Sequence, residues 1–374
     1  LEKNVPKKPV IVYGANGYTG RLVCEALRNF QIPFIAAGRD ATRIADTMSR
    51  VPGIETAEYE VVQVEHKLET LVDLFKGSEL VCNTVGPFHE FGDIVVEAAA
   101  QAGIHYIDTT GELHFMERIR DKYDAVFKTN GKVVAPCVAY MFSLLEIAAE
   151  IVLETPGIDT IEGVCSASGI PTVGSTRTIV SNFPFGAMSY YLENRKRVLW
   201  PAGRGYEVKL PGQAITQLSL PWGGGSLPFY YERDARVRNC RQLAGFSNRE
   251  MMEQIVALGA MYVNDIEPLP PEQQAVRLQA IAESMTPGDP PRENALIHRT
   301  IDHIDGRGGN TTASCTIFGF MPYLITGAVQ GAVANFLIHG GQRGSGFMSA
   351  CQAVGHRNLL GQLKNFGLVE VVHS

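Results

Sequence analysis

The sequence predicts an α/β protein: a doubly wound parallel sheet, followed by a second α+β domain with a mostly antiparallel sheet. Three observations lead to this fold class. Short apolar runs alternate with helical periodicity over residues 10–151, a glycine-rich turn follows the first run, and residues 296–318 alternate in polarity like a hairpin. The chain has 374 residues, enough for two or three domains.

The first part of the chain reads as a series of strand–helix units. Apolar residues at helical spacing, such as Leu22, Val23 and Ala26, follow the first strand, and the same change of period recurs along the chain. The predicted strands are residues 10–13, 34–37, 59–64, 80–82, 105–107 and 132–135. Such a series predicts the strand order 3-2-1-4-5-6, with ligands at the carboxyl ends of the strands.

The second part changes pattern after residue 155. We predict a domain at 1–155, an α+β substrate or dimerisation domain at 156–318, and C-terminal helices at 319–374 that pack back on the first domain. Within the domain at 156–318 we expect a strand at 160–168, a partly helical segment at 175–194 and a helix at 268–285. Residues 316–338 carry no charged side chain, but Pro322, Gln330 and Asn335 favour a buried helix over a membrane span.

Composition limits the partners. The net charge is −6, which argues against nucleic acid because binders of phosphate backbones carry a basic face. Seven cysteines without a CxxC pair indicate buried thiols in a reducing, cytoplasmic setting. The histidines show no ligand spacing, so no metal site is expected. Membrane association is not expected either.

The strongest chemical signal is the turn after the first predicted strand. Glycines spaced GxxGxxG permit a tight turn and let the backbone approach a pyrophosphate at a helix N-terminus. The alternative is a glycine-rich turn in an α/β domain that binds no nucleotide. The residues expected to bind the cofactor here are Gly14, Asn16, Gly17, Tyr18, Thr19 and Gly20.

The end of the second strand distinguishes the cofactors. Sites specific for NAD place an acid there to hold the ribose hydroxyls. Here Arg39 is placed to pair with a 2′-phosphate, and Asp40 is placed to cap the next helix. The sequence therefore predicts NADP(H) as cofactor. Alternatively, Arg39 is a solvated surface residue, or Asp40 reaches the ribose and NAD binds.

Two further loops follow predicted strands at the same edge. Val85, Gly86 and Pro87 come after the fourth strand, where a loop would run beside the nicotinamide half of the cofactor. Glu112 comes after the fifth strand and is either a site carboxylate or a cap of the following helix.

These motifs resemble the saccharopine dehydrogenase-like family, which includes bacterial trans-acting enoyl reductases. The matching segments are residues 14–21, 37–40, 85–88, 92–112 and 322–326. The resemblance implies a Rossmann domain, a discontinuous substrate domain and nicotinamide-dependent reduction of C=N or C=C bonds. The family's acidic residue after the sixth strand is missing here, and Tyr140 lies near its place, which argues against amino-acid chemistry.

The sequence therefore predicts an NADP(H)-dependent reductase of a largely apolar small molecule. Residues 156–230 hold few cations but many aromatic side chains, which suggest an apolar pocket, although any one of them can be core. Tyr140, Tyr323 and Glu112 are the candidate proton donors; Tyr140 can instead pack against the cofactor or the domain interface. The alternative function is a non-catalytic NADP-binding sensor or scaffold. A homodimer formed through the second sheet is also expected.

Overall fold

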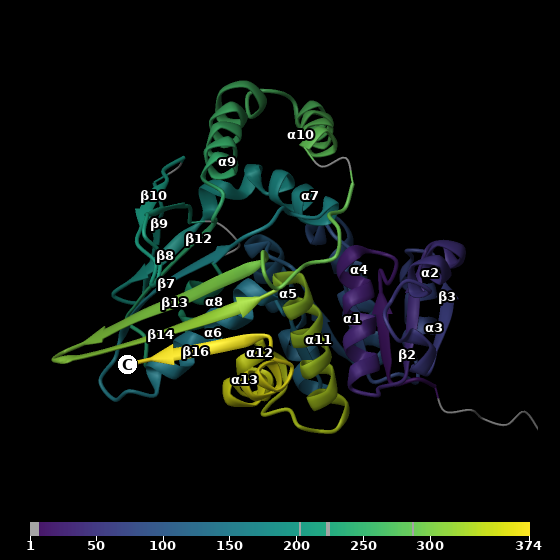
Figure 1. Cartoon of the computed structure of the whole chain (residues 1–374). Coiled ribbons are helices and arrows are strands. Elements are labelled where there is room, and N and C mark those ends of the chain that lie inside the picture. The colour runs from purple at the N-terminus through teal and green to yellow at the C-terminus, as the bar shows by residue number, and fades with distance from the viewer. Residues whose placement is uncertain (1–6, 202, 222–224, 286–287) are drawn as a thin grey trace, which may run out of the picture. The chain divides into compact units, whose positions relative to one another are not determined.

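The computed structural model describes residues 7–201, 203–221, 225–285 and 288–374. The chain divides into two compact units (Figure 1). The first unit contains the chain up to Thr110 and residues 115–140 and 323–363; the second contains residues 111–114, 141–322 and 364–374. The domain boundaries predicted at 155/156 and 318/319 stay predictions.

The first unit is built on a seven-stranded sheet of order β15-β6-β5-β4-β1-β2-β3. Every pairing in it is parallel, and the predicted order 3-2-1-4-5-6 is confirmed. The two-residue strand β15 was not predicted, because so short a segment carries no periodicity. The strands are β1 Val10–Tyr13, β2 Phe34–Gly38, β3 Tyr59–Gln63, β4 Leu80–Asn83, β5 His105–Asp108, β6 Val133–Ala135 and β15 Gly346–Phe347.

Helices α3, α4 and α5 supply one large apolar cluster against this sheet. Ile11 and Tyr13 of β1 point into it together with Val81 and Tyr106, as the period of two along a strand requires. The helices of the first unit are α1 Tyr18–Asn29, α2 Ala41–Met48, α3 Leu68–Phe75, α4 Phe88–Ala102, α5 Leu113–Thr129, α11 Pro322–Ile338, α12 Ala350–Val354 and α13 His356–Asn365, with a 3₁₀ turn at Ile54–Thr56.

Helix α11 joins the first unit although it comes much later in the chain than the last strand of the predicted series. It packs closely on α1: a Cβ atom at Gly327 would lie 2.6 Å from the Leu22 carbonyl oxygen. The predicted buried helix is thus confirmed. Among the helices of the described residues, none is both long and apolar enough to cross a membrane.

The second unit contains a seven-stranded mixed sheet of order β16-β14-β13-β7-β12-β8-β9. Only β7 and β12 pair in parallel, so the predicted mostly antiparallel sheet is confirmed. The predicted hairpin is the long pair β13–β14 (Figure 1). The strands are β7 Thr160–Ala167, β8 Tyr190–Glu193, β9 Lys196–Leu199, β12 Asn239–Phe246, β13 Arg299–Gly308, β14 Thr311–Phe320 and β16 Val369–His373, with a separate pair β10 Tyr206–Val208 and β11 Gln217–Ser219.

The predicted partly helical segment 175–194 is confirmed, because α7 covers Val173–Ser181. The segment ends in strand β8, where Tyr190 and Leu192 are buried and Tyr191 and Glu193 are more exposed, as a period of two requires. The prediction that the C-terminal segment is helical was wrong in part, because β16 pairs with β14. The helices of this unit are α6 Tyr140–Leu153, α7 Val173–Ser181, α8 Ser226–Tyr231, α9 Arg249–Met261 and α10 Pro271–Met285, with a 3₁₀ helix at Phe183–Met188 and a π-helix at Tyr262–Ile266.

The cysteines are all free and buried, as the sequence predicted. A buried thiol is a small apolar group, and burial raises the pKa of Cys82, Cys165 and Cys240. The cytoplasmic location and the homodimer stay predictions.

Candidate cofactor and active site

The turn between β1 and α1 is pressed against the loop after β4. Gly14 has a φ of +92°, a region that glycine adopts without strain, and its N–H donates to the Ala37 carbonyl at 2.9 Å. A Cβ atom at Gly14 would lie 2.7 Å from Thr84 Oγ1 and 2.8 Å from Val85 Cγ2. This position therefore needs glycine for its backbone conformation and for the space around it.

Helix α1 begins with no side chain to cap it, because its N-cap residue is Gly17. A Cβ atom at Gly20 would lie 2.9 Å from the Cα atom of Ala15, so the first turn of the helix is also packed on the glycine turn. Uncapped N–H groups at a helix N-terminus carry partial positive charge and attract anions. The turn fits a diphosphate, whose oxygens would accept hydrogen bonds from this helix end.

Arg39 and Asp40 follow β2, and both are exposed. Asp40 caps α2, as predicted, by accepting a hydrogen bond from the Arg43 N–H at 3.0 Å. The positive charge of Arg39 acts on Tyr13 and His66, which lie near it. Arg39 lowers the pKa of Tyr13, but the larger effect of burial raises it to about 12, so the phenol stays protonated at neutral pH.

A buried chain of polar side chains ties the ends of β4, β5 and β6 together. Asn83 Nδ2 donates to the Tyr106 hydroxyl at 3.0 Å, and that hydroxyl donates to Asp108 Oδ2 at 2.8 Å. Asp108 Oδ1 accepts the N–H groups of Thr110 at 2.9 Å and Cys137 at 3.1 Å. Buried polar groups with their hydrogen bonds satisfied specify one geometry, so this network fixes the loops that follow three strands.

The loop after β4 is held by the same network. The Val85 N–H donates to Asn83 Oδ1 at 3.0 Å. Gly86 and Pro87 are joined by a cis peptide bond, and Pro87 is the N-cap residue of α4. The predicted nicotinamide loop is therefore anchored at its start by Asn83 and at its end by a helix.

Gln330 of α11 also holds this edge of the first sheet, although it lies far along the sequence from the strands. It is fully buried, and its Nε2 donates to the carbonyl oxygens of Asp108 at 2.9 Å and Val138 at 2.8 Å. The backbone it holds includes Cys137, whose φ of +61° is rare for a residue other than glycine. Strained conformations persist where the surroundings determine them, and here Gln330 and Asp108 do so.

The two tyrosine candidates lie at the starts of helices. The Tyr140 N–H, at the first residue of α6, donates to Thr326 Oγ1 at 3.1 Å. Tyr323 lies in the first turn of α11 and meets the Tyr18 ring edge-on, with ring centroids 5.2 Å apart. The Arg21 guanidinium covers the Tyr18 ring at 4.4 Å. Since Tyr18 belongs to the glycine turn, Tyr323 lies beside the predicted diphosphate site.

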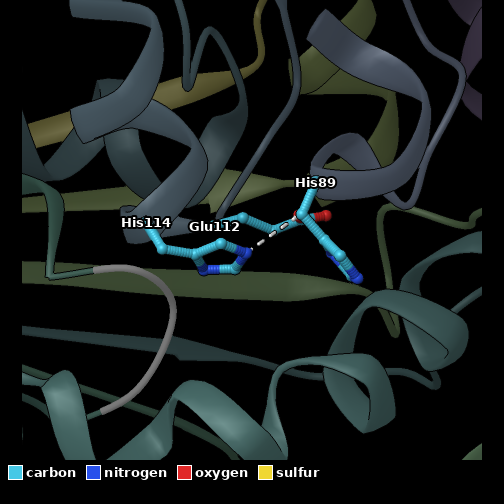
Figure 2. A group of neighbouring side chains, drawn as sticks. All are labelled: His89, Glu112 and His114. Carbon is cyan, nitrogen blue, oxygen red and sulfur yellow. Dashed lines mark ion pairs between the residues drawn. The ribbon is translucent and has the colours of Figure 1, made fainter. Parts of the chain in front are cut away.

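Glu112 belongs to the second unit and is fully buried. Its Oε2 lies 3.9 Å from His114 Nε2 (Figure 2). The His114 ring stacks on Phe185, with centroids 3.6 Å apart and planes at 15°. His89, also drawn in Figure 2, belongs to the first unit, where its Nε2 lies 3.6 Å from Glu90.

Four of the aromatic side chains predicted for a substrate pocket are core residues. Tyr190, Phe229, Tyr230 and Tyr231 are buried within the second unit. Phe185, on His114, lies beside a candidate site residue. Trp222 lies outside the described residues.

The first unit brings together the glycine turn, the loop after β4, Tyr140 and Tyr323 at one edge of its sheet. Three residues that hold this edge were not predicted from the sequence: Asn83, Asp108 and Gln330. The first two are polar residues that end apolar strands, and the third is the glutamine in a helix free of charge. A buried polar residue in such a place needs a partner, and that signal could have marked all three.

Comparison with known proteins adds two findings about the parts of this chain. Residues 10–134 match the saccharopine dehydrogenase NADP-binding domain, and residues 144–372 match a family of unknown function, DUF5938. The first match covers the glycine turn, Arg39 and the buried polar chain. The second covers most of the second unit and α11.

Curated relatives match about a third of this chain. A lipid droplet localized protein of Caenorhabditis elegans is 31% identical over 34% of this chain and 32% of its own length. A trans-acting enoyl reductase of Mycobacterium ulcerans is 29% identical over 34% of this chain and 31% of its own length. The chain thus spans about a third of the length of the curated relatives it matches.

One solved structure shares this fold over nearly the whole chain. The apo saccharopine dehydrogenase (L-Glu forming) of Saccharomyces cerevisiae aligns with 98% of this chain and 100% of its own, with a TM-score of 0.58 and 12% identity. At that identity the likeness shows the fold. By the extent of its matches, the chain belongs to the family of unknown function DUF5938, and it carries a saccharopine dehydrogenase NADP-binding domain at residues 10–134.

Proposed function

We propose that this protein is an NADP(H)-dependent oxidoreductase that transfers hydride between the nicotinamide and a C=C or C=N bond of a largely apolar small molecule. The observation that carries the proposal is the uncapped start of α1 in a glycine turn packed against the β4–α4 loop. The match of residues 10–134 to an NADP-binding domain supports it. So does the relative in Mycobacterium ulcerans named as an enoyl reductase.

The residues proposed to hold the cofactor are those that form the edge of the first sheet. The glycine turn and the start of α1 would bind the diphosphate, and Arg39 would bind the 2′-phosphate as a charge-assisted donor. The loop after β4 would lie along the nicotinamide. The proposed set is Gly14, Asn16, Gly17, Tyr18, Thr19, Gly20, Arg39, Val85, Gly86 and Pro87. Bound there, the nicotinamide supplies the hydride.

Reduction of a double bond also needs a proton, and the chain offers three candidate donors. Tyr140 and Tyr323 carry phenols at the starts of α6 and α11, held in place by Thr326 and Tyr18. Glu112 is a buried carboxyl beside His114. We favour the tyrosines, because a phenol is ordinarily protonated at neutral pH and can both donate and recover a proton.

Turnover tests this proposal. NADPH consumption is measured with α,β-unsaturated thioesters of increasing chain length and with cyclic imines, with NADH as the comparison cofactor. We expect one class to be reduced, with a preference for longer apolar chains. Y140F, Y323F and E112Q then identify the donor, whose loss we expect to lower kcat by about 10²- to 10⁴-fold. Y59F, which removes a phenol from β3 in the same unit, is the matched control.

A non-catalytic NADP-binding protein gives a different result in the same experiment. NADPH would bind, but no compound of either class would accelerate its oxidation. That outcome would overturn the reductase and favour the sensor or scaffold. Absence of any NADPH binding would instead remove both functions.

A further inference from the structure

A second polar side chain lies beside Arg39 at the edge of the first sheet. His66 follows β3, and its Nδ1 is 2.8 Å from the Tyr13 hydroxyl. The two rings are nearly parallel, with an interplanar angle of 8° and centroids 6.0 Å apart. Phe91 of α4 meets His66 edge-on, with centroids 5.6 Å apart. The imidazole is therefore fixed by a hydrogen bond and by two rings.

The strand register explains why these residues meet. Tyr13 is opposite Ala37 on β2, and Ala37 is opposite Val62 on β3, so the three side chains share one face of the sheet. Arg39 comes two residues after Ala37, and His66 comes four residues after Val62. Both lie just beyond the ends of their strands, at the edge where ligands of doubly wound sheets bind.

We propose that His66 is a second recognition residue for the 2′-phosphate of NADP(H), beside Arg39, and that it takes up a proton when that phosphate binds. The inference rests on the proposed role of Arg39. Tyr13 engages Nδ1, and among the described residues nothing bonds Nε2. Nε2 is thus the nitrogen that can donate to a phosphate oxygen.

The charges around His66 determine the direction of the proton change. Burial and the Arg39 guanidinium both lower the pKa of His66, so the ring is neutral at neutral pH in the free protein. Its chain neighbours Glu65 and Lys67 form an ion pair with each other at 2.5 Å, and Tyr13 is held protonated by burial. A phosphate beside Arg39 cancels the repulsion and attracts the imidazolium. The proton that the His66 ring takes up comes from the solvent.

Tyr13 acts on the phosphate through His66 and is a positioning residue. Its hydroxyl can donate to or accept from Nδ1, so it holds the ring in either charge state. Y13F keeps the aromatic packing and removes this hydrogen bond. We expect it to reduce NADPH affinity less than loss of the imidazole does, and to leave NADH affinity unchanged.

Calorimetry of the full chain tests the inference without turnover. NADPH, NADH and adenosine 2′,5′-bisphosphate are titrated in two buffers of different ionisation enthalpy, which gives the protons taken up on binding. The phosphate can itself release a proton as it meets Arg39, so the decisive quantity is the difference between wild type and H66Q. H339Q, at the exposed end of α11, is the matched control.

We expect the wild type and H339Q to take up more protons with NADPH than H66Q does, and the same number as H66Q with NADH. We also expect H66Q to weaken NADPH and the bisphosphate by roughly 10- to 100-fold, with NADH unchanged. With rising pH, the preference for NADPH in the wild type should decline relative to that in H66Q.

Equal losses for NADPH and NADH in H66Q would place His66 on the adenine and overturn the inference. So would proton uptake that H66Q leaves unchanged. Either result would leave the NADP(H) oxidoreductase standing, whereas a wild type that binds neither NADPH nor the bisphosphate would refute that proposal as well.

Discussion

The aspartate buried in the second sheet gives a prediction about stability. Asp302 lies in the middle of β13, opposite Cys165 on β7 and Ile317 on β14, and is fully buried. Thr300 Oγ1 donates to its Oδ2 at 3.0 Å. Its Oδ1 has no hydrogen-bond partner within the part of the chain that the structure describes. A carboxylate here would be charged without a compensating cation.

The substitution Asp302→Asn keeps the shape of the side chain and removes its charge. Burial raises the pKa of Asp302 well above its ordinary 3.8. The folded state holds the proton more tightly than the unfolded state. The contribution of this carboxyl to stability is therefore fully present below the pKa that it has in the unfolded state. It falls as the pH rises towards the folded pKa, by roughly 1 kcal/mol for each pH unit. The asparagine side chain of the D302N variant does not titrate, so that loss disappears.

The assay is denaturant unfolding of the second unit at a series of pH values from mildly acidic to neutral. Subtracting the D302N curve from the wild-type curve cancels every other titrating group. We expect the variant to gain about 2 kcal/mol in stability relative to the wild type over two pH units, with an even gain per pH unit until the folded pKa is reached. D305N changes an exposed aspartate on the same strand, and we expect it to track the wild type.

A constant difference in stability between D302N and the wild type at all pH values would contradict this prediction. Such a result would mean that the carboxyl titrates alike in the folded and unfolded states. A variant that is less stable at every pH would mean that the carboxylate has a charged role that the hydrogen bonds of this region do not reveal.

Three more predictions concern the first unit. Burial lowers the pKa of His105 to about 4, so the stability that its neutral ring contributes above pH 6.5 is lost as the pH falls towards 4. H105N does not titrate and keeps an acceptor for the Val133 N–H. In acid titration we expect this variant to be about 3 kcal/mol more resistant to unfolding than the wild type. In equilibrium binding, R39Q should lower the affinity for NADPH by about 10- to 100-fold and the affinity for NADH by less than about twofold. Equal losses of affinity would refute the assignment of Arg39 to the 2′-phosphate. G327A should destabilise by about 2 kcal/mol in thermal unfolding, because the new Cβ would lie 2.6 Å from the Leu22 carbonyl oxygen, whereas G361A, with open space around it, should be neutral or stabilising.

Local pattern was sufficient for the first sheet and for part of the second. The alternation of apolar runs with helical spacing predicted six strands in the right order, and glycine at position 14 predicted a turn that the backbone makes with positive φ. The β13–β14 hairpin was predicted for the same reason, since its strands are neighbours in sequence. In contrast, strand β8 at the end of the partly helical segment 175–194 was not predicted, because its four residues are too few to show a reliable period.

The candidate site was predicted in its parts, but the way its parts are held was not. The sequence identified Gly14, Arg39 and Tyr323 as residues at strand ends and helix starts. It did not show that Gln330 would bond the carbonyl of Asp108, 222 positions away. No local pattern encodes such a pairing.

The amino-acid sequence was enough to specify the parallel sheet, its glycine turn and the cap at Asp40, because these depend on backbone conformation and on neighbours within a few residues. The folded chain was needed to bring His66 to Tyr13 and to bury Asp302 between two strands. Those environments arise from strand register and long-range packing, and they set the charge that each side chain can carry.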